Sequence, residues 1–175
     1  MPKTPAPTPP LAAVAQDAHW TATLAKLRAR TRPTAILTIC DDDTARRRLA
    51  EARQRHARAQ LTGEPDQLAA AEVALAAAQA TFDDVAIVLT FQALPRTLFE
   101  ELKLAHPPTE AQAEDGHPFN VETLGPELIS TASLDGLTVD DARTFLTEWA
   151  EGEATQLFHA AWDIQDTTRA DLGKG

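Results

Sequence analysis

The chain has 175 residues, which is enough for one domain, or for one domain with an appendage. Hydrophobic residues make up 43% of it but aromatic residues only 5%, so its core has few large anchors. The formal net charge of -10 argues against a nucleic-acid partner over most of the surface, because phosphates would be repelled.

The charge is divided unevenly along the chain. Residues 26–58 hold ten basic and four acidic side chains, whereas residues 83–175 hold eighteen acidic and five basic ones. This polarity favours a protein that meets other proteins by electrostatic complementarity. Cys40 is the only cysteine, so no internal disulfide can form, which fits a reducing compartment. Without a secretory signal or an apolar run near the roughly 20 residues that span a bilayer, we expect a cytoplasmic protein with no membrane partner.

The N-terminal part predicts a tail, a helix and a strand. Residues 1–16 are proline-rich and predict a disordered tail. Asp17 can cap a helix that runs to about Arg30, in which we expect Trp20 to be a core anchor. Residues 34–40 are rich in β-branched side chains and predict a strand.

Residues 43–82 carry the clearest periodicity of the chain. Two amphipathic segments are separated by a break at residues 62–65, so they predict an antiparallel helical hairpin. The apolar positions advance alternately by four and three residues, and in order they are Ala45, Leu49, Ala52, His56 and Ala59, then Leu68, Ala71, Leu75, Ala78 and Phe82.

The first hairpin helix also carries a stripe of arginines away from this seam: Arg47, Arg48, Arg55 and Arg58. The simplest interpretation is a solvated face, and the sharper one is a docking stripe for an acidic partner segment. Nucleic-acid binding ranks third, since no aromatic side chain is interleaved for stacking.

The acidic triplet Asp41, Asp42 and Asp43 precedes that helix. It allows a metal site or a helix cap, and we favour the cap, since no second ligand cluster has suitable spacing. Elsewhere, Glu148, Glu151 and His159 allow a cluster across adjacent helices, but an exposed acidic face explains them more simply. With no phosphate-binding loop or nucleophile elbow in the sequence, we expect no catalytic residue, cofactor or metal, and no enzyme.

Residues 85–91 predict a second strand with two apolar faces, covered on both sides and paired antiparallel with residues 34–40. Two strands alone are only marginally stable, so they need helices packed on one face or strands from another copy of the chain. A homo-oligomer is therefore one possibility. Pro95 suits the first turn of a helix that ends at His106, and residues 107–118 predict a linker.

The rest is helical in pattern. Thr138 and Asp141 resemble a capping box, and three short helices can make a small bundle. The predicted fold class is a predominantly helical α+β fold, in which a small antiparallel ribbon carries the inserted hairpin and precedes a C-terminal bundle. The domain limits are a tail over 1–16, an α+β domain over 17–106, a linker over 107–118, a helical subdomain over 119–165 and a flexible tail over 166–175.

Three runs of the chain form an ordered pattern: FQALPRTLFEELKLAHPPT (91–109), HPFNVETLGPELISTAS (117–133) and LTVDDARTFLTEWAEGEATQLFHAAWDI (137–164). This pattern resembles tail assembly chaperones of long-tailed phages of actinobacteria. In that family a strand with an aromatic end precedes a Leu-Pro-Arg-like turn, a helix and His-Pro-Pro, then a Phe-Asn segment and a Leu-Thr-x-x-x-Ala helix leading to a tryptophan-containing helix. The positions that fall into this order are Phe91, Leu94, Pro95, Arg96, Leu102, His106, Pro107, Pro108, Phe119, Asn120, Thr123, Leu128, Leu137, Thr138, Trp149 and Trp162. The match covers about residues 34–165, with residues 124–126 departing from the usual Phe-Pro.

The resemblance implies a non-enzymatic role in the host bacterial cytoplasm. Such chaperones bind the tape measure protein while tail tube protein polymerises around it, and are absent from the mature virion. A frameshifted long form of the chain is a further expected partner, and residues 172–175 are compatible with a slippery codon run. Two alternatives stay open, a structural virion component such as a connector or tail-completion protein, and a DNA-binding regulator that uses the basic helix.

We place the expected client surface on the C-terminal helices, at Leu128, Phe145, Trp149, Phe158 and Trp162, with the arginine stripe as a second, electrostatic contact. The alternative is that these apolar side chains form the core of the bundle, which is the more frequent fate of such residues.

Overall fold

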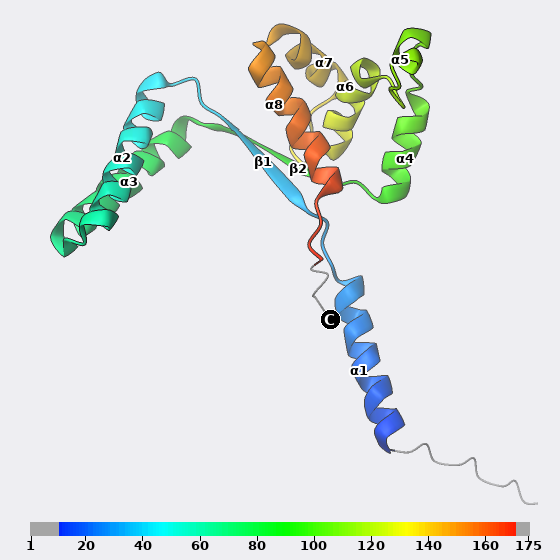
Figure 1. Cartoon of the computed structure of the whole chain (residues 1–175), viewed down its shortest axis with the longest axis horizontal. Coiled ribbons are helices and arrows are strands. Elements are labelled where there is room, and N and C mark those ends of the chain that lie inside the picture. The colour runs from blue at the N-terminus through cyan, green and yellow to red at the C-terminus, as the bar shows by residue number, and fades with distance from the viewer. Residues whose placement is uncertain (1–10, 171–175) are drawn as a thin grey trace, which may run out of the picture. The chain divides into compact units, whose positions relative to one another are not determined.

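The computed structural model of the chain describes residues 11–170, with side chains from Asp17 onward. Contacts divide the chain into two units, residues 1–32 and 33–175, and each is considered by itself. Eight helices account for most of the 69% helical content of the described part, and the one sheet there has two antiparallel strands (Figure 1). The predicted class, a predominantly helical α+β fold, is therefore confirmed.

The first unit contains one described helix, α1 (Leu11–Arg28). It begins before Asp17, so the predicted cap at that residue is wrong. Trp20 is 58% exposed, and the expectation that it anchors a core is wrong as well. Of the predicted tail, residues 1–10 lie outside the described part, and residues 11–16 are helical.

The second unit is organised on a two-stranded ribbon of β1 (Thr34–Ile39) and β2 (Ile87–Gln92). The strands are antiparallel, and Leu37 lies opposite Leu89. The backbone N–H of Ala93 donates to the carbonyl of Pro33 at 2.9 Å, which continues the ladder beyond the strand ends. β2 begins later than predicted, because the preceding helix extends through Val85.

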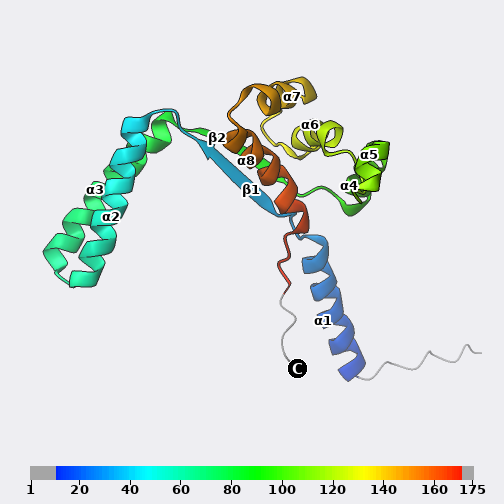
Figure 2. The ribbon, with the colours of Figure 1, turned by 45° about the horizontal axis from the view of Figure 1, so that its top comes forward.

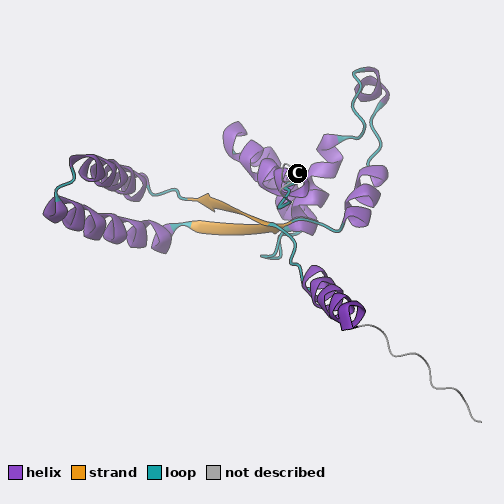
Figure 3. Cartoon of the chain, turned by 60° about the horizontal axis from the view of Figure 1, so that its bottom comes forward, coloured by secondary structure: helices purple, strands orange, loops and turns teal. Residues whose placement is uncertain are grey.

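The hairpin inserted between the strands consists of α2 (Asp43–Thr62) and α3 (Pro65–Val85), which pack side by side (Figure 3). The predicted alanine-rich seam is the packed face of α2, where Ala45, Leu49, Ala52 and Ala59 are buried and His56 is half-buried. The Asp42 carboxylate caps α2 by accepting hydrogen bonds from the N–H groups of Thr44 and Ala45. The triplet therefore supplies a helix cap.

Short helices cover one face of the ribbon (Figures 1 and 2). α8 contacts both strands and α6 contacts β2. The helices of this body and the final 3-10 turn are α4 (Arg96–Ala105), α5 (Glu110–Glu114), α6 (Val121–Ala132), α7 (Val139–Glu148), α8 (Glu151–Trp162) and η1 (Asp163–Asp166). Their shared core consists of Phe91, Leu128, Ile129, Ala132, Ala142, Leu157 and Ala161.

One local expectation for the helical body differs from the structure, and another is confirmed. The segment predicted as a linker contains α5, which begins at a capping box formed by Thr109 and Gln112. Pro126 lies inside α6, and Gly152 lies inside α8. The predicted capping box of Thr138 and Asp141 is confirmed at the start of α7.

The second face of the ribbon has no helical cover from the residues described in the second unit. On this face Ile36 is 68% exposed and Val88 is 49% exposed. The expectation that β2 is covered on both sides is therefore wrong. Of the helices described between residues 11 and 170, none combines the length and hydropathy needed to cross a lipid bilayer.

Candidate functional site

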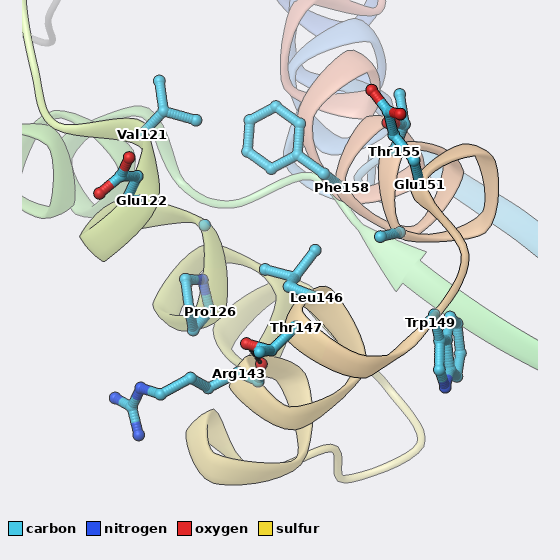
Figure 4. Close-up of a pocket in the computed structure, with 12 residues that line it drawn as sticks. Val121, Glu122, Pro126, Arg143, Leu146, Thr147, Trp149, Glu151, Thr155 and Phe158 are labelled. Atoms are coloured by element: carbon cyan, nitrogen blue, oxygen red, sulfur yellow. Dashed lines mark hydrogen bonds between the residues drawn. The ribbon is translucent and has the colours of Figure 1, made fainter.

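An open groove of about 610 Å³ lies among helices α6, α7 and α8. Its walls are mostly apolar, and charged side chains stand at its edge. The residues that line it are Val121, Glu122, Gly125, Pro126, Arg143, Leu146, Thr147, Trp149, Glu151, Ala154, Thr155 and Phe158 (Figure 4). Such a concave, mainly apolar surface with a few polar groups is typical of a binding site.

A glycine sets the depth of the groove. A Cβ placed on Gly125 would lie 3.5 Å from Leu146 Cδ1 and 3.5 Å from Phe158 Cδ2, which is ordinary van der Waals contact. The absent side chain therefore leaves a methyl-sized gap where α6 faces α7 and α8. The next residue, Pro126, has no backbone N–H to donate within α6, and its ring lines the groove.

Two aromatic side chains frame the groove from different helices. Phe158 projects from α8 towards α6 (Figure 4). Trp149 is half-buried at the end of α7, where its backbone N–H donates to the carbonyl of Phe145 at 3.1 Å. Its ring stacks on Phe145, with the ring centroids 4.7 Å apart and the planes 17° from parallel. This stack holds the Trp149 ring in place and leaves part of it exposed.

The edge of the groove carries both signs of charge. Glu122 and Glu151 are exposed acids, and Arg143 is an exposed base that forms an ion pair with Asp140 one turn earlier in α7. The start of α7 is fixed by Asp141, which accepts hydrogen bonds from the hydroxyl and backbone N–H of Thr138. These hydrogen bonds hold the pKa of Asp141 below its ordinary value, since they stabilise the carboxylate.

The structure separates the five apolar residues predicted as a client surface. Trp149 and Phe158 line the groove, and Phe145 supports Trp149. Leu128 is 0% exposed and belongs to the core.

Trp162 also lies apart from the groove lining. Its ring packs against Phe99, Phe119 and Phe158, at centroid distances of 5.5, 5.3 and 5.7 Å. It therefore holds α8 against α4 and against the segment that precedes α6.

The predicted arginine stripe stays on the hairpin and does not join the groove. Arg55 and Arg58 line one shallow hollow on the hairpin, and Arg47 lines another. Arg55 forms an exposed ion pair with Glu51 at 3.3 Å, and Arg47 Nε donates to the carbonyl of Asp43 at 3.3 Å. Arg48 lies exposed on the same helix. The stripe is thus a solvated basic surface in the structure.

No protein-family model, curated protein or solved structure matches the chain. The description of the site therefore depends on its own geometry. Among the described residues, no group of three or more histidine, cysteine, aspartate or glutamate side chains is arranged to hold a metal ion.

Sequence reasoning did not predict most of the groove lining. The groove residues it missed include Val121, Gly125, Pro126 and Leu146. One signal was available, because Gly125 and Pro126 are both poor helix formers and yet lie inside α6. A local conflict of this kind is expected where function competes with folding.

Proposed function

We propose that the chain is a non-enzymatic tail assembly chaperone that binds an amphipathic helical segment of a phage tape measure protein in the groove of α6, α7 and α8. The observation that carries this proposal is an open apolar groove with a partly exposed tryptophan, held by a folded body. The resemblance described above supplies the identity of the client, with tail tube protein as the subunit that later replaces the chaperone.

The groove has the properties needed for reversible contact with a polypeptide. Its apolar walls offer a surface for the apolar stripe of a helix, and such stripes bind grooves through side chains spaced three and four residues apart. Trp149 is a suitable anchor, since partly exposed tryptophans often contribute most to binding. The charges of Glu122, Arg143 and Glu151 surround the walls and can meet the polar edges of the client.

The test is coexpression of the chain with a tape measure protein, measuring how much of that protein stays soluble and copurifies. Val121→Glu is the informative variant, because Val121 lines the groove and is 41% exposed. It is also the first residue of α6, where an acidic side chain is favoured by the helix dipole, so folding is retained. We expect at least about a tenfold loss of binding, which corresponds to about 1.4 kcal/mol.

Leu134→Glu is the matched control. Leu134 is 57% exposed and lies outside the groove lining, so the same chemical change there is expected to leave binding intact. Equal binding by both variants would refute the groove as the client site. Detection of the chain in purified particles would instead support the structural virion component, since an assembly chaperone leaves the finished tail.

A further inference from the structure

The two outer edges of the ribbon are treated differently by the chain. The outer edge of β2 is covered at its centre, where Thr90 accepts a hydrogen bond from the N–H of Leu134 at 2.8 Å and donates its own N–H to the Asp135 carboxylate. A bridge between Phe91 and Ser133 adds to this cover. The segment after α6 therefore satisfies the outward-pointing backbone groups of Thr90.

The outer edge of β1 has no such cover in the described part of the chain. Pro33 accepts a hydrogen bond from Ala93, so its backbone faces β2, and successive residues of a strand face alternate sides. The backbone N–H and C=O groups of Thr34, Ile36 and Thr38 consequently point away from β2. The missing N–H of Pro33 lies on the inner side and leaves this outer edge intact.

The open edge also lacks the usual protection against strand pairing. Exposed edges in proteins commonly carry charges, prolines or bulges. The outward-pairing residues here are two threonines and one isoleucine, and Ile36 is 68% exposed. The edge is uncharged although the chain carries a net charge of -10, so a second copy meets no like charge from these positions.

The sequence of β1 is close to a palindrome about Ile36. Thr34 and Thr38 are equally distant from it, and so are Ala35 and Leu37. When two β1 strands pair antiparallel with Ile36 opposite Ile36, Thr34 of each copy lies opposite Thr38 of the other on the open face of the sheet. On the inner face this pairing places the small Ala35 opposite the larger Leu37. In this register the outward-pointing N–H and C=O groups of Thr34, Ile36 and Thr38 lie opposite the same groups of the second copy.

We propose that two copies of the chain pair through the outer edges of β1, with Ile36 on the twofold axis, and form a continuous four-stranded sheet. Each of Thr34, Ile36 and Thr38 donates one hydrogen bond to the other copy and accepts one. This interface is independent of the groove that carries the proposed function.

The surface beside the edge accommodates the second strand. A shallow hollow of about 400 Å³ runs between β1 and α8. It is lined on the strand by Ala35, Ile36 and Leu37, on the helix by Gln156, His159 and Ala160, and beyond the helix by Asp163, Ile164 and Thr167. An added strand presents its own Ala35 and Leu37 to this hollow, since these residues lie on the inner face. The pairing thus buries apolar surface as well as completing backbone hydrogen bonds.

The test uses the full chain and measures its mass in solution by light scattering and sedimentation over a concentration series. We expect twice the 18.9 kDa of one chain for the unmodified protein. Ile36→Lys and Ile36→Glu each place like charges directly opposite one another at the axis, so each variant alone is expected to be monomeric. A mixture of the two places opposite charges there and is expected to restore the dimer.

Val88→Lys is the matched control, because Val88 lies on the same open face of the ribbon but on β2. It is expected to remain dimeric. Circular dichroism of each variant establishes that the helices are intact. A monomeric unmodified chain, or a dimer that persists in Ile36→Lys, would overturn the proposal. A mixture of the two variants that stays monomeric would also overturn it. The same holds for an Ile36→Lys chain that keeps the mass of the unmodified protein and loses only client binding.

Discussion

Side chains of the C-terminal helices divide between those that hold the body together and those that line the groove. Leu128 and Val121 illustrate the division, since both lie on α6 and yet Leu128 is 0% exposed and Val121 is 41% exposed.

His106 belongs to the side chains that hold the body together. Its Nδ1 lies 3.0 Å from the hydroxyl of Thr123 and its Nε2 lies 3.2 Å from a carboxylate oxygen of Glu127, so it joins the end of α4 to α6.

Leu128→Ala is expected to destabilise the folded state, because it leaves a cavity in the core beneath β2. The expected loss in the free energy of unfolding is about 2–5 kcal/mol. Urea denaturation followed by tryptophan fluorescence measures it. Val121→Glu is the comparison on the same helix and is expected to change stability far less, so similar losses in both would contradict the assignment of Leu128 to the core.

The carboxylate cap of α2 makes part of the stability depend on pH. Hydrogen bonds from the N–H groups of Ala45 and Thr44 hold the pKa of Asp42 below 3.8, the ordinary value. A lowered pKa in the folded state means that this stabilisation is complete above pH 3.8 and is lost as the pH falls through and below that value.

Asp42→Asn tests this account, since asparagine caps helices about as well as aspartate but does not titrate. We expect the variant to match the original near neutral pH and to lose less stability on acidification. The measurement is the difference between the two proteins in denaturant midpoint across a pH series. Parallel pH curves for the two proteins would rule out a role for the Asp42 charge.

At the scale of elements, the hairpin of α2 and α3 is an insertion with closely spaced ends. Ile39 and Ile87 are direct partners in the ribbon, so the chain leaves and re-enters the sheet at one point. They form a hydrogen-bonded pair, because they lie an even number of residues from the pair formed by Pro33 and Ala93. A pair of this kind can be closed by a two-residue turn.

Replacement of residues 40–86 by Asn-Gly is therefore expected to leave the ribbon and body folded. Asn-Gly favours the tight turn that matches the twist of paired strands. Cooperative thermal unfolding and an unchanged tryptophan emission spectrum are the expected readouts, since Trp20, Trp149 and Trp162 all lie outside the hairpin. Loss of cooperative unfolding would show that the body needs the hairpin.

The elements that could be predicted from the sequence are those with a long uniform period. The seam of Ala45, Leu49 and Ala52 could be predicted from helical spacing alone. The capping box of Thr138 and Asp141 could be predicted from the local chemistry of the two side chains. The helix over residues 110–114 was missed because it is one short turn set by a cap. Val85 was assigned to the second strand because β-branched side chains are common in strands. In the structure α3 continues through this residue.

At the scale of the molecule, the groove could be predicted only in part. The aromatic members Trp149 and Phe158 were expected from their position on helical stripes, but periodicity does not distinguish a side chain in the core from one beside a groove. That distinction arises when three helices meet around Gly125, and it depends on contacts between residues distant in sequence. The assignment of a tape measure client rests on the resemblance and is tested by the coexpression experiment.

The unequal edges of the ribbon have a consequence for how large an assembly can become. When two copies join through β1, both margins of the resulting sheet are β2, and Leu134 and Asp135 already occupy the backbone of Thr90 there. In the described part of the chain, a third copy can therefore pair with Thr90 at either margin only by displacing this segment. The cover over Thr90, at the centre of each outer strand, therefore disfavours growth of the sheet beyond a pair of chains.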